Sequence, residues 1–99
     1  MAKSPRVTVL GDGGWGTCLT ILLSKKGFPV TLWGAFSDDV AQVRKTRENL
    51  KFLPGVKLPT QIELTNDLAQ ALSRPEVIVV AVPSQYLRQV LSRAQGAIW

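Results

Sequence analysis

Short apolar runs alternate with longer amphipathic segments along the chain. Runs rich in β-branched residues, bounded by glycine, proline or polar residues, predict buried strands. The clearest of them is EVIVVAV, which is ended by Pro83. The runs that predict strands are residues 6–10, 29–33, 61–65 and 76–82.

The segments between and after these runs have the length and polarity of helices. Gly27 is a natural stop for the first helix, and Ser37 and Ser84 are candidate caps for the second and the fourth. Residues 51–60 predict a proline-broken loop, and residues 96–99 predict the start of one more strand. Strands that alternate with helices predict an α/β fold with a parallel sheet and right-handed crossovers. The segments that predict helices are residues 15–26, 37–50, 66–74 and 85–95.

The composition sets limits on this prediction. Hydrophobic residues make up 45% and charged residues 19% of the 99 positions, which is ordinary for one small globular domain. The apolar runs are far shorter than the ~20 residues that span a bilayer, so no membrane segment is predicted. Cys18 is the only cysteine, which excludes an internal disulfide and is consistent with a cytoplasmic location. The sequence has no histidine, the commonest metal ligand and general base, and we expect no metal site.

The net charge of +5 favours anionic ligands. Lys25 and Lys26 end the first predicted helix, and three further cations lie among residues 44–47 of the second. No aromatic-rich basic stripe accompanies these cations, so nucleic acid is not a predicted partner. Small anions such as phosphate esters fit the charge better.

Glycines cluster between the first predicted strand and the first predicted helix. Gly11, Gly13 and Gly16 fit the pattern GxGxxG in the strand–turn–helix context that identifies a dinucleotide-binding turn. The first glycine permits a tight turn, the second lets a pyrophosphate approach the main chain, and the third lets the helix pack closely on the strand. The N–H groups at the helix start then face the phosphates. The predicted cofactor is therefore NAD or NADP.

Two features depart from the usual fingerprint. Asp12 puts a negative charge inside the turn, where it opposes pyrophosphate binding unless it points to solvent. The acid expected at the end of the second strand, which grips the ribose 2′-hydroxyl in NAD-binding folds, is missing, because residues 33–36 read WGAF. No arginine is obviously placed for a 2′-phosphate, so the choice between NAD and NADP stays open.

Three segments, GDGGWGTCLT, ENLKFLPGVKLP and VIVVAVPSQYLRQVL, together resemble the NAD(P)-dependent glycerol-3-phosphate dehydrogenases. They cover nearly the whole chain, in order and at the right spacing. NLKFLPG at residues 49–55 and VPSQ at residues 82–85 are more specific than the glycine turn, because a generic dinucleotide-binding domain needs neither. The expected fold is a Rossmann-type parallel sheet of about four strands in the order 3-2-1-4, with flanking helices.

The resemblance implies an oxidoreductase of glycerol-3-phosphate metabolism and phospholipid biosynthesis, which interconverts glycerol 3-phosphate and dihydroxyacetone phosphate by hydride transfer. In this family a nucleotide-binding domain precedes a helical substrate domain. Carried onto this sequence, the glycine turn holds the pyrophosphate, Phe36 lies near the adenosine, and residues 82–84 border the nicotinamide half. Tyr86 matches an aromatic position that contacts the cofactor. The cofactor-binding residues implied in this way are Gly11, Gly13, Gly14, Trp15, Gly16, Phe36, Val82, Pro83, Ser84 and Tyr86.

The family's catalytic lysines and its substrate domain lie beyond the segment that this chain matches, so no catalytic residue is assigned. We expect residues 1–99 to form a single, partial nucleotide-binding domain that is inactive alone as an oxidoreductase. A fifth strand would normally cover the edge at residues 76–82, and an open edge invites association. The expected partners are thus the small-molecule substrate of the full-length enzyme and a second copy in a homodimer.

Two alternatives stay open. One is another dehydrogenase, of the 6-phosphogluconate or UDP-sugar type, which shares the opening fingerprint, although NLKFLPG argues against it. The other is a stand-alone nucleotide-binding or interaction module that performs no catalysis, which would explain the absence of histidine and of a catalytic lysine motif.

Overall fold

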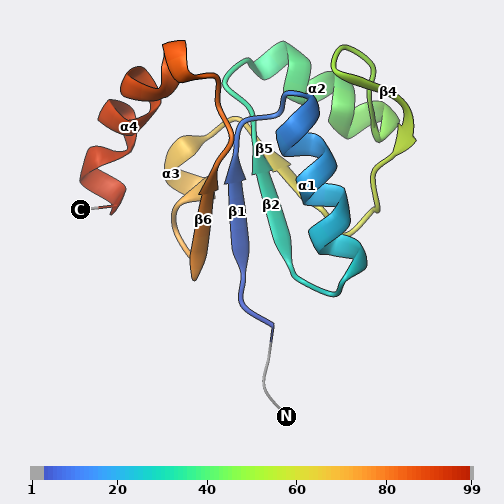
Figure 1. Cartoon of the computed structure of the whole chain (residues 1–99), viewed down its shortest axis with the longest axis horizontal. Coiled ribbons are helices and arrows are strands. Elements are labelled where there is room, and N and C mark those ends of the chain that lie inside the picture. The colour runs from blue at the N-terminus through green and yellow to red at the C-terminus, as the bar shows by residue number, and fades with distance from the viewer. Residues whose placement is uncertain (1–3, 99) are drawn as a thin grey trace.

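The computed structural model describes residues 4–98 and contains a four-stranded parallel sheet. The strands lie in the order β5-β2-β1-β6 (Figure 1), and because β5 and β6 are the third and fourth predicted strands, the predicted order is confirmed. The bounds of these strands are Val7–Leu10 for β1, Val30–Trp33 for β2, Glu63–Thr65 for β5 and Val77–Val80 for β6.

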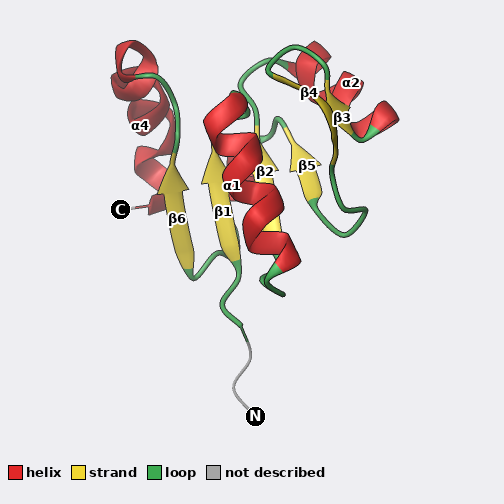
Figure 2. Ribbon diagram, turned by 45° about the vertical axis from the view of Figure 1, so that its right-hand side comes forward, coloured by secondary structure: helices red, strands yellow, loops and turns green. Residues whose placement is uncertain are grey.

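The helices lie on both sides of the sheet, as the predicted Rossmann-type architecture requires. Figure 1 shows α1 in front of the sheet and α3 behind it, with α4 beyond the end of β6. In Figure 2 the four arrows of the sheet point to the same end of the molecule, where loops lead into the helices. The helix bounds are Gly14–Lys25 for α1, Ser37–Thr46 for α2, Leu68–Ala71 for α3 and Ser84–Ile98 for α4.

The two faces of the sheet each have an apolar core. Successive residues of a strand point to opposite faces. Val9 and Leu32 accordingly pack with residues of α1 and α2, whereas Leu10 and Trp33 pack with residues of α3 and α4. None of these four side chains is more than 1% exposed, so β1 and β2 are fixed by burial on both faces.

The loop predicted at residues 51–60 is wrong, because much of this segment belongs to an antiparallel hairpin. In it β3 (Glu48–Asn49) pairs with β4 (Leu53–Lys57). Gly55 has a φ of 85°, a left-handed conformation that glycine adopts readily, and its N–H donates to Oε2 of Glu48 at 2.9 Å. The Pro-Gly pair that reads as a strand breaker is thus accommodated by a local contact across the hairpin.

Three boundary predictions are also wrong. The helix predicted over residues 37–50 ends at Thr46, because Arg47 adopts a left-handed conformation with φ 57° and ψ 31°. Ser37 and Ser84 are the first residues of α2 and α4 and do not precede them as caps. Residues 96–98 continue α4, since so short an apolar run fits a helix as well as a strand, and Trp99 lies outside the described residues.

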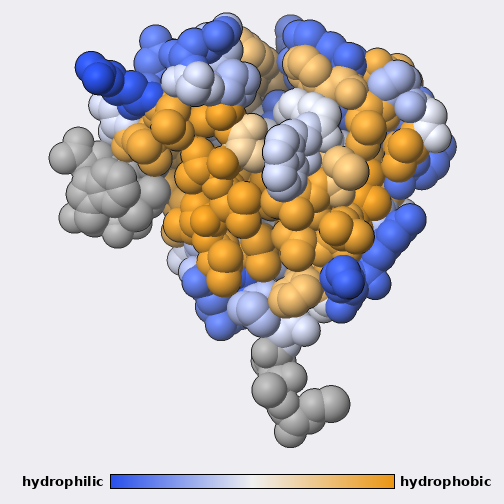
Figure 3. Space-filling view, in the orientation of Figure 1, coloured by the Kyte–Doolittle hydropathy of each residue, from blue (hydrophilic) through white to orange (hydrophobic). Residues whose placement is uncertain are grey.

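The edge of the sheet at β6 is apolar, as predicted. Val77 and Val80 are 43% and 42% exposed, and within residues 4–98 β6 pairs with β1 alone. Figure 3 shows apolar side chains gathered over the middle of the face seen in Figure 1. Association through this edge stays a prediction.

Candidate functional site

The carboxyl ends of the central strands are joined to one another just before the glycine turn. The N–H of Gly11 donates to the carbonyl of Trp33 at 2.8 Å, and the N–H of Ala81 donates to the carbonyl of Leu10 at 2.7 Å. From β1 the chain crosses over to β2, which pairs with β1 on one side, whereas β6 pairs with β1 on the other side. Ligands of open α/β sheets bind at such a switch point, outside the carboxyl ends of the strands.

Gly11 can only be glycine for two independent reasons. Its φ is +122°, and a Cβ at this position would come within 2.7 Å of the Ala81 carbonyl oxygen and 3.0 Å of the Val82 nitrogen. Both neighbours are backbone atoms, which cannot swing aside as a flexible side chain can. The turn predicted at Gly11 therefore also brings β1 against the start of the β6–α4 connection.

Gly16 allows α1 to pack directly on this turn. A Cβ on Gly16 would overlap the carbonyl oxygen of Gly11 and would lie 3.3 Å from Cβ of Ala81. The close packing of helix on strand that GxGxxG predicts for its third glycine is present in this geometry.

Gly13 and Gly14 leave the start of α1 accessible. Gly13 is the N-cap, supplies no side-chain hydrogen bond, and would place a Cβ in open space, with nothing within 4 Å. The first turn of α1 contains no acidic residue, so its N–H groups and the helix dipole are available to an anion. Trp15 is 70% exposed, which shows that its indole does not fill the turn. A Cβ on Gly14 would lie 3.1 Å from the Phe52 carbonyl oxygen, so the hairpin approaches the helix start closely.

A buried asparagine that the sequence did not single out fixes this approach. Asn49 is 2% exposed, and its Nδ2 donates to the Asp12 carbonyl at 2.7 Å and to Oγ1 of Thr17 at 2.9 Å. Its Oδ1 accepts from the N–H of Phe52 at 3.2 Å. The NLKFLPG motif, which begins at Asn49, was the one sequence feature that could have pointed to this residue. The sequence alone did not indicate what Asn49 does.

The Asp12 side chain points away from the space next to Gly13 and lies against the end of β2. A Cβ on Gly34 would overlap the Asp12 carboxylate, at 2.6 Å from Cγ, and would lie 2.7 Å from Cγ2 of Val40. Burial raises the pKa of the Asp12 carboxyl above its usual value; Asp39 raises it further, whereas Lys51 and the Asp12 backbone N–H oppose the rise. The carboxylate therefore sits beside Gly34 and not in the open space next to Gly13.

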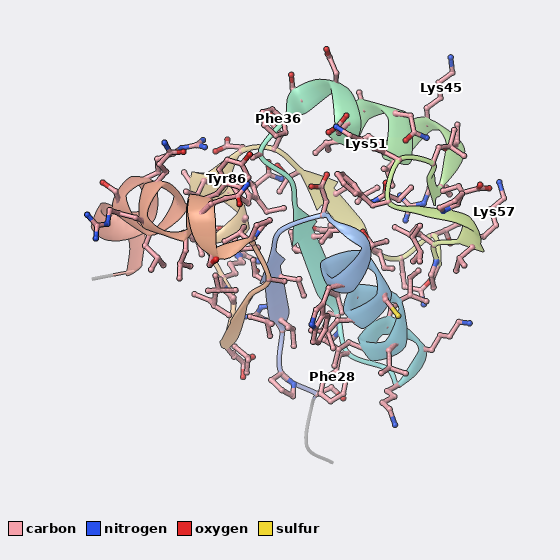
Figure 4. The ribbon with its side chains drawn as sticks, turned by 45° about the horizontal axis from the view of Figure 1, so that its top comes forward. Phe28, Phe36, Lys45, Lys51, Lys57 and Tyr86 are labelled. Carbon is pink, nitrogen blue, oxygen red and sulfur yellow. The ribbon has the colours of Figure 1, made fainter. Side chains whose placement is uncertain are left out.

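The remaining predicted residues surround the same end of the sheet. Figure 4 shows Phe36, at the start of α2, and Tyr86, at the start of α4, at this end of the molecule, with Lys51 of the hairpin also nearby. Phe36 and Tyr86 are 65% and 47% exposed. Val82 is half-buried in the core, while Pro83 and Ser84 are exposed where α4 begins.

A cavity of about 260 Å³ lies elsewhere, at the amino ends of β1 and β2. Its lining includes Arg6, Pro29, Gln61 and Arg74 and none of the predicted site residues. Because ligands of this sheet type bind at the opposite end, this cavity is not where a nucleotide is expected. Among residues 4–98, no cluster of potential metal ligands is present, and no helix is long and apolar enough to cross a membrane.

Comparison with known proteins agrees with this geometry. Residues 6–99 match the family described as NAD-dependent glycerol-3-phosphate dehydrogenase N-terminus. The glycerol-3-phosphate dehydrogenase (NAD(P)+) of Syntrophomonas wolfei is 48% identical over 91 residues, which are 92% of this chain and 26% of that protein. The protein of the same name from Bacillus subtilis is 43% identical over 89 residues, 90% of this chain and 26% of that protein.

Solved structures show the same relationship. The crystal structure of glycerol-3-phosphate dehydrogenase from Coxiella burnetii superposes with a TM-score of 0.92 at 31% identity, covering 97% of this chain and 30% of that one. The Plasmodium falciparum glycerol-3-phosphate dehydrogenase gives a TM-score of 0.83 at 26% identity, covering 95% and 29% of the two chains. This chain spans about a quarter of the length of the curated relatives that it matches.

Proposed function

The chain belongs to the family of NAD-dependent glycerol-3-phosphate dehydrogenases, as part of its N-terminal NAD-binding domain, and on that premise we propose that it holds the nucleotide for hydride transfer between glycerol 3-phosphate and dihydroxyacetone phosphate. When bound, the nicotinamide of the cofactor gives or accepts the hydride. The role of these residues is to bind and orient the rest of the cofactor.

The observation that best supports this proposal is the open space at Gly13. A Cβ on Gly13 would meet no atom within 4 Å, and the first helical turn of α1 contains no acidic residue. Partial positive charge at a helix start suits a pyrophosphate, which has two negative charges. The net charge of +5 adds a favourable long-range field. The residues at this end of the sheet thus fit the diphosphate of NAD(P).

The two ends of the cofactor are assigned to the two sides of β1. We place the adenosine on the β2 side, near Phe36, whose exposed ring is available to a flat base. Residues 82–84 follow β6 on the other side of β1 and border the nicotinamide half, with Tyr86 in the first turn of α4. Gly14 and Trp15 contact the pyrophosphate from the helix start.

We assign no catalytic residue within the chain. Lys51 lies 3.4 Å from Oδ2 of Asp39, and Lys57 donates to the carbonyl of Thr46 at 3.2 Å. Figure 4 shows Lys57 at the outer side of the hairpin, away from the carboxyl end of the sheet. With no histidine in the sequence and both of these lysines engaged locally, we expect binding without turnover.

Calorimetric titration of the chain with NADH tests the binding. We expect weak affinity, because only part of the dinucleotide site is present, and at least about a tenfold loss in the Gly13→Val variant, whose side chain would occupy the phosphate space. The matched control is Cys18→Val, an exposed position further along α1. The proposed site would be refuted if millimolar NADH produced no binding heat, or if the Gly13→Val variant bound NADH as tightly as the parent chain.

An assay with dihydroxyacetone phosphate and NADH tests the absence of turnover. We expect no oxidation of NADH above the rate without protein. Measurable turnover by the purified chain would show that a catalytic group exists among its residues and that inactivity was wrongly inferred.

A further inference from the structure

The end of β2 lacks the acid that usually recognises the adenosine ribose. In dinucleotide-binding sheets a carboxylate at this point accepts from the ribose 2′-hydroxyl, and a nearby arginine replaces it where a 2′-phosphate is bound. Here Trp33 is followed by Gly34, Ala35 and Phe36. None of these residues can supply a charge.

The structure brings a carboxylate to this point from another element. Asp12, in the β1–α1 turn, lies so close to Gly34 that a Cβ there would fall 2.6 Å from the Asp12 Cγ. Gly34 itself follows β2 directly, and its N–H donates to the Thr65 carbonyl at 3.0 Å. The absence of a side chain at Gly34 and the position of the Asp12 carboxylate therefore depend on each other.

We propose that Asp12 takes the place of the missing acid at the end of β2, accepts from the adenosine ribose, and makes the chain prefer NAD(H) to NADP(H). This inference rests on the proposed function, since it concerns the same nucleotide site. It gives Asp12, an apparent departure from the fingerprint, a role in choosing the cofactor.

The charges around Asp12 support the proposal. Asp39 adds a second carboxylate to its surroundings, and Lys51, the cation that opposes the rise in the Asp12 pKa, lies 3.4 Å from Oδ2 of Asp39. A 2′-phosphate placed here would meet like charge, which is strongly unfavourable in a partly desolvated site.

The arginines of the α2 segment do not offset this charge. Arg44 donates to the Leu64 carbonyl, and Arg47 donates to the carbonyls of Pro59 and Ile62. Both guanidinium groups are therefore engaged where α2 meets the segment around β5.

The environment of the carboxylate also favours a ribose. The backbone N–H of Asp12 contributes a hydrogen bond to this carboxylate, and Asn49 donates to the Asp12 carbonyl instead. Burial disfavours the ionised form, so added hydroxyl donors would stabilise it. A ribose brings such donors, whereas a 2′-phosphate replaces one of them with further negative charge.

Titration of the chain with NADH and NADPH, by calorimetry, tests the proposal. We expect NADH to bind about tenfold or more tightly than NADPH, and Asp12→Asn to reduce this ratio to about threefold or less, chiefly by improving NADPH binding. The matched control is Asp38→Asn, which removes an exposed carboxylate from the first turn of α2 and should leave the ratio unchanged.

The outcomes separate the inference from the proposed function. Equal or tighter binding of NADPH by the unmodified chain, or an unchanged ratio in Asp12→Asn, overturns the role of Asp12 while the site itself stands. Binding of neither nucleotide overturns both. If Asp12→Asn fails to fold, the salt dependence of the unmodified chain decides, because screening should lower the ratio as ionic strength rises, and a constant ratio contradicts the proposal.

Discussion

The side-chain amide of Asn49 donates to the backbone carbonyl of Asp12 at 2.7 Å, across 37 residues of sequence. The same amide donates to Oγ1 of Thr17, so one buried side chain joins the β3–β4 hairpin to both the glycine turn and α1. Two regions that the sequence presents as separate motifs are thus joined in the folded chain.

Replacement of Asn49 by alanine should therefore weaken the fold and the site together. The loss removes one of the two donors to the Asp12 carbonyl, which Oγ1 of Thr17 also reaches at 3.1 Å, and it takes the acceptor from the N–H of Phe52. Losing buried hydrogen bonds of this kind costs about 1–3 kcal/mol of unfolding free energy. Urea denaturation measures this cost, and NADH titration of the folded variant should show weaker binding. Asn66→Ala, at an exposed asparagine, is the control and should stay within about 0.5 kcal/mol of the parent. Equal stability of the two variants would mean that the hairpin is held by other contacts.

Gly16 and Gly13 give a matched pair of substitutions in one turn. Gly16→Ala should lower the unfolding free energy by about 2–3 kcal/mol, because the new Cβ overlaps the Gly11 backbone and the helix must shift. Gly13→Ala should cost less than about 1 kcal/mol, since its Cβ enters open space and only the N-cap preference is affected. Thermal and urea unfolding of both variants measure the difference. The packing role of Gly16 would be refuted if the two substitutions had the same effect on stability.

Local sequence patterns predicted the strands and the first turn because these depend on short-range chemistry. β1 and β2 are buried on both faces, which requires continuous apolar runs, and the strain at Gly11 requires glycine. Signals of this kind can be recognised within a short segment of the sequence, without knowledge of distant contacts. The order of the strands was instead implied by the resemblance to the glycerol-3-phosphate dehydrogenases.

The parts that the sequence did not predict depend on contacts between distant residues or on single dihedral angles. The hairpin forms because Glu48 accepts from the N–H of Gly55 and because Arg47 turns the chain in a left-handed conformation, and neither is encoded in apolar periodicity. The position of the Asp12 carboxylate depends on the space at Gly34, which only the folded sheet reveals. The geometry of the glycine turn was therefore predictable from the sequence, whereas the packing of the hairpin and of the end of β2 against it was not.

The mutual dependence of Asp12 and Gly34 should be visible in a double-mutant cycle. Gly34→Ala should be destabilising, because its Cβ meets the Asp12 carboxylate and Cγ2 of Val40. In an Asp12→Ala background the first clash is removed, so the same substitution should cost less, by a coupling energy of about 0.5–3 kcal/mol. Rescue should be partial, since Val40 remains. Unfolding free energies of the four proteins from urea denaturation measure the coupling, and strict additivity would show that the two residues do not compete for this space.

The raised pKa of Asp12 also predicts how stability depends on pH. Its carboxyl in the folded chain keeps its proton to a higher pH than the ordinary aspartate pKa of 3.8, so between the two pKa values the folded state binds more protons than the unfolded state. The stability that Asp12 contributes is therefore fully present below the unfolded pKa and is lost as the pH rises through the folded pKa.

Asp12→Asn, which keeps the shape without the ionisation, should consequently be more stable than the parent chain at pH 7. The difference should shrink as the pH is lowered toward the unfolded pKa of 3.8, where the parent carboxyl becomes protonated in both states. Urea denaturation at pH 7, 5 and about 4 measures this trend. Asp38→Asn is the control and should instead lower stability slightly at pH 7, because it removes a favourable charge from the first turn of α2. A parent chain more stable than Asp12→Asn at pH 7 would mean that the ionised carboxylate is stabilised where it lies, against the desolvation that raises its pKa.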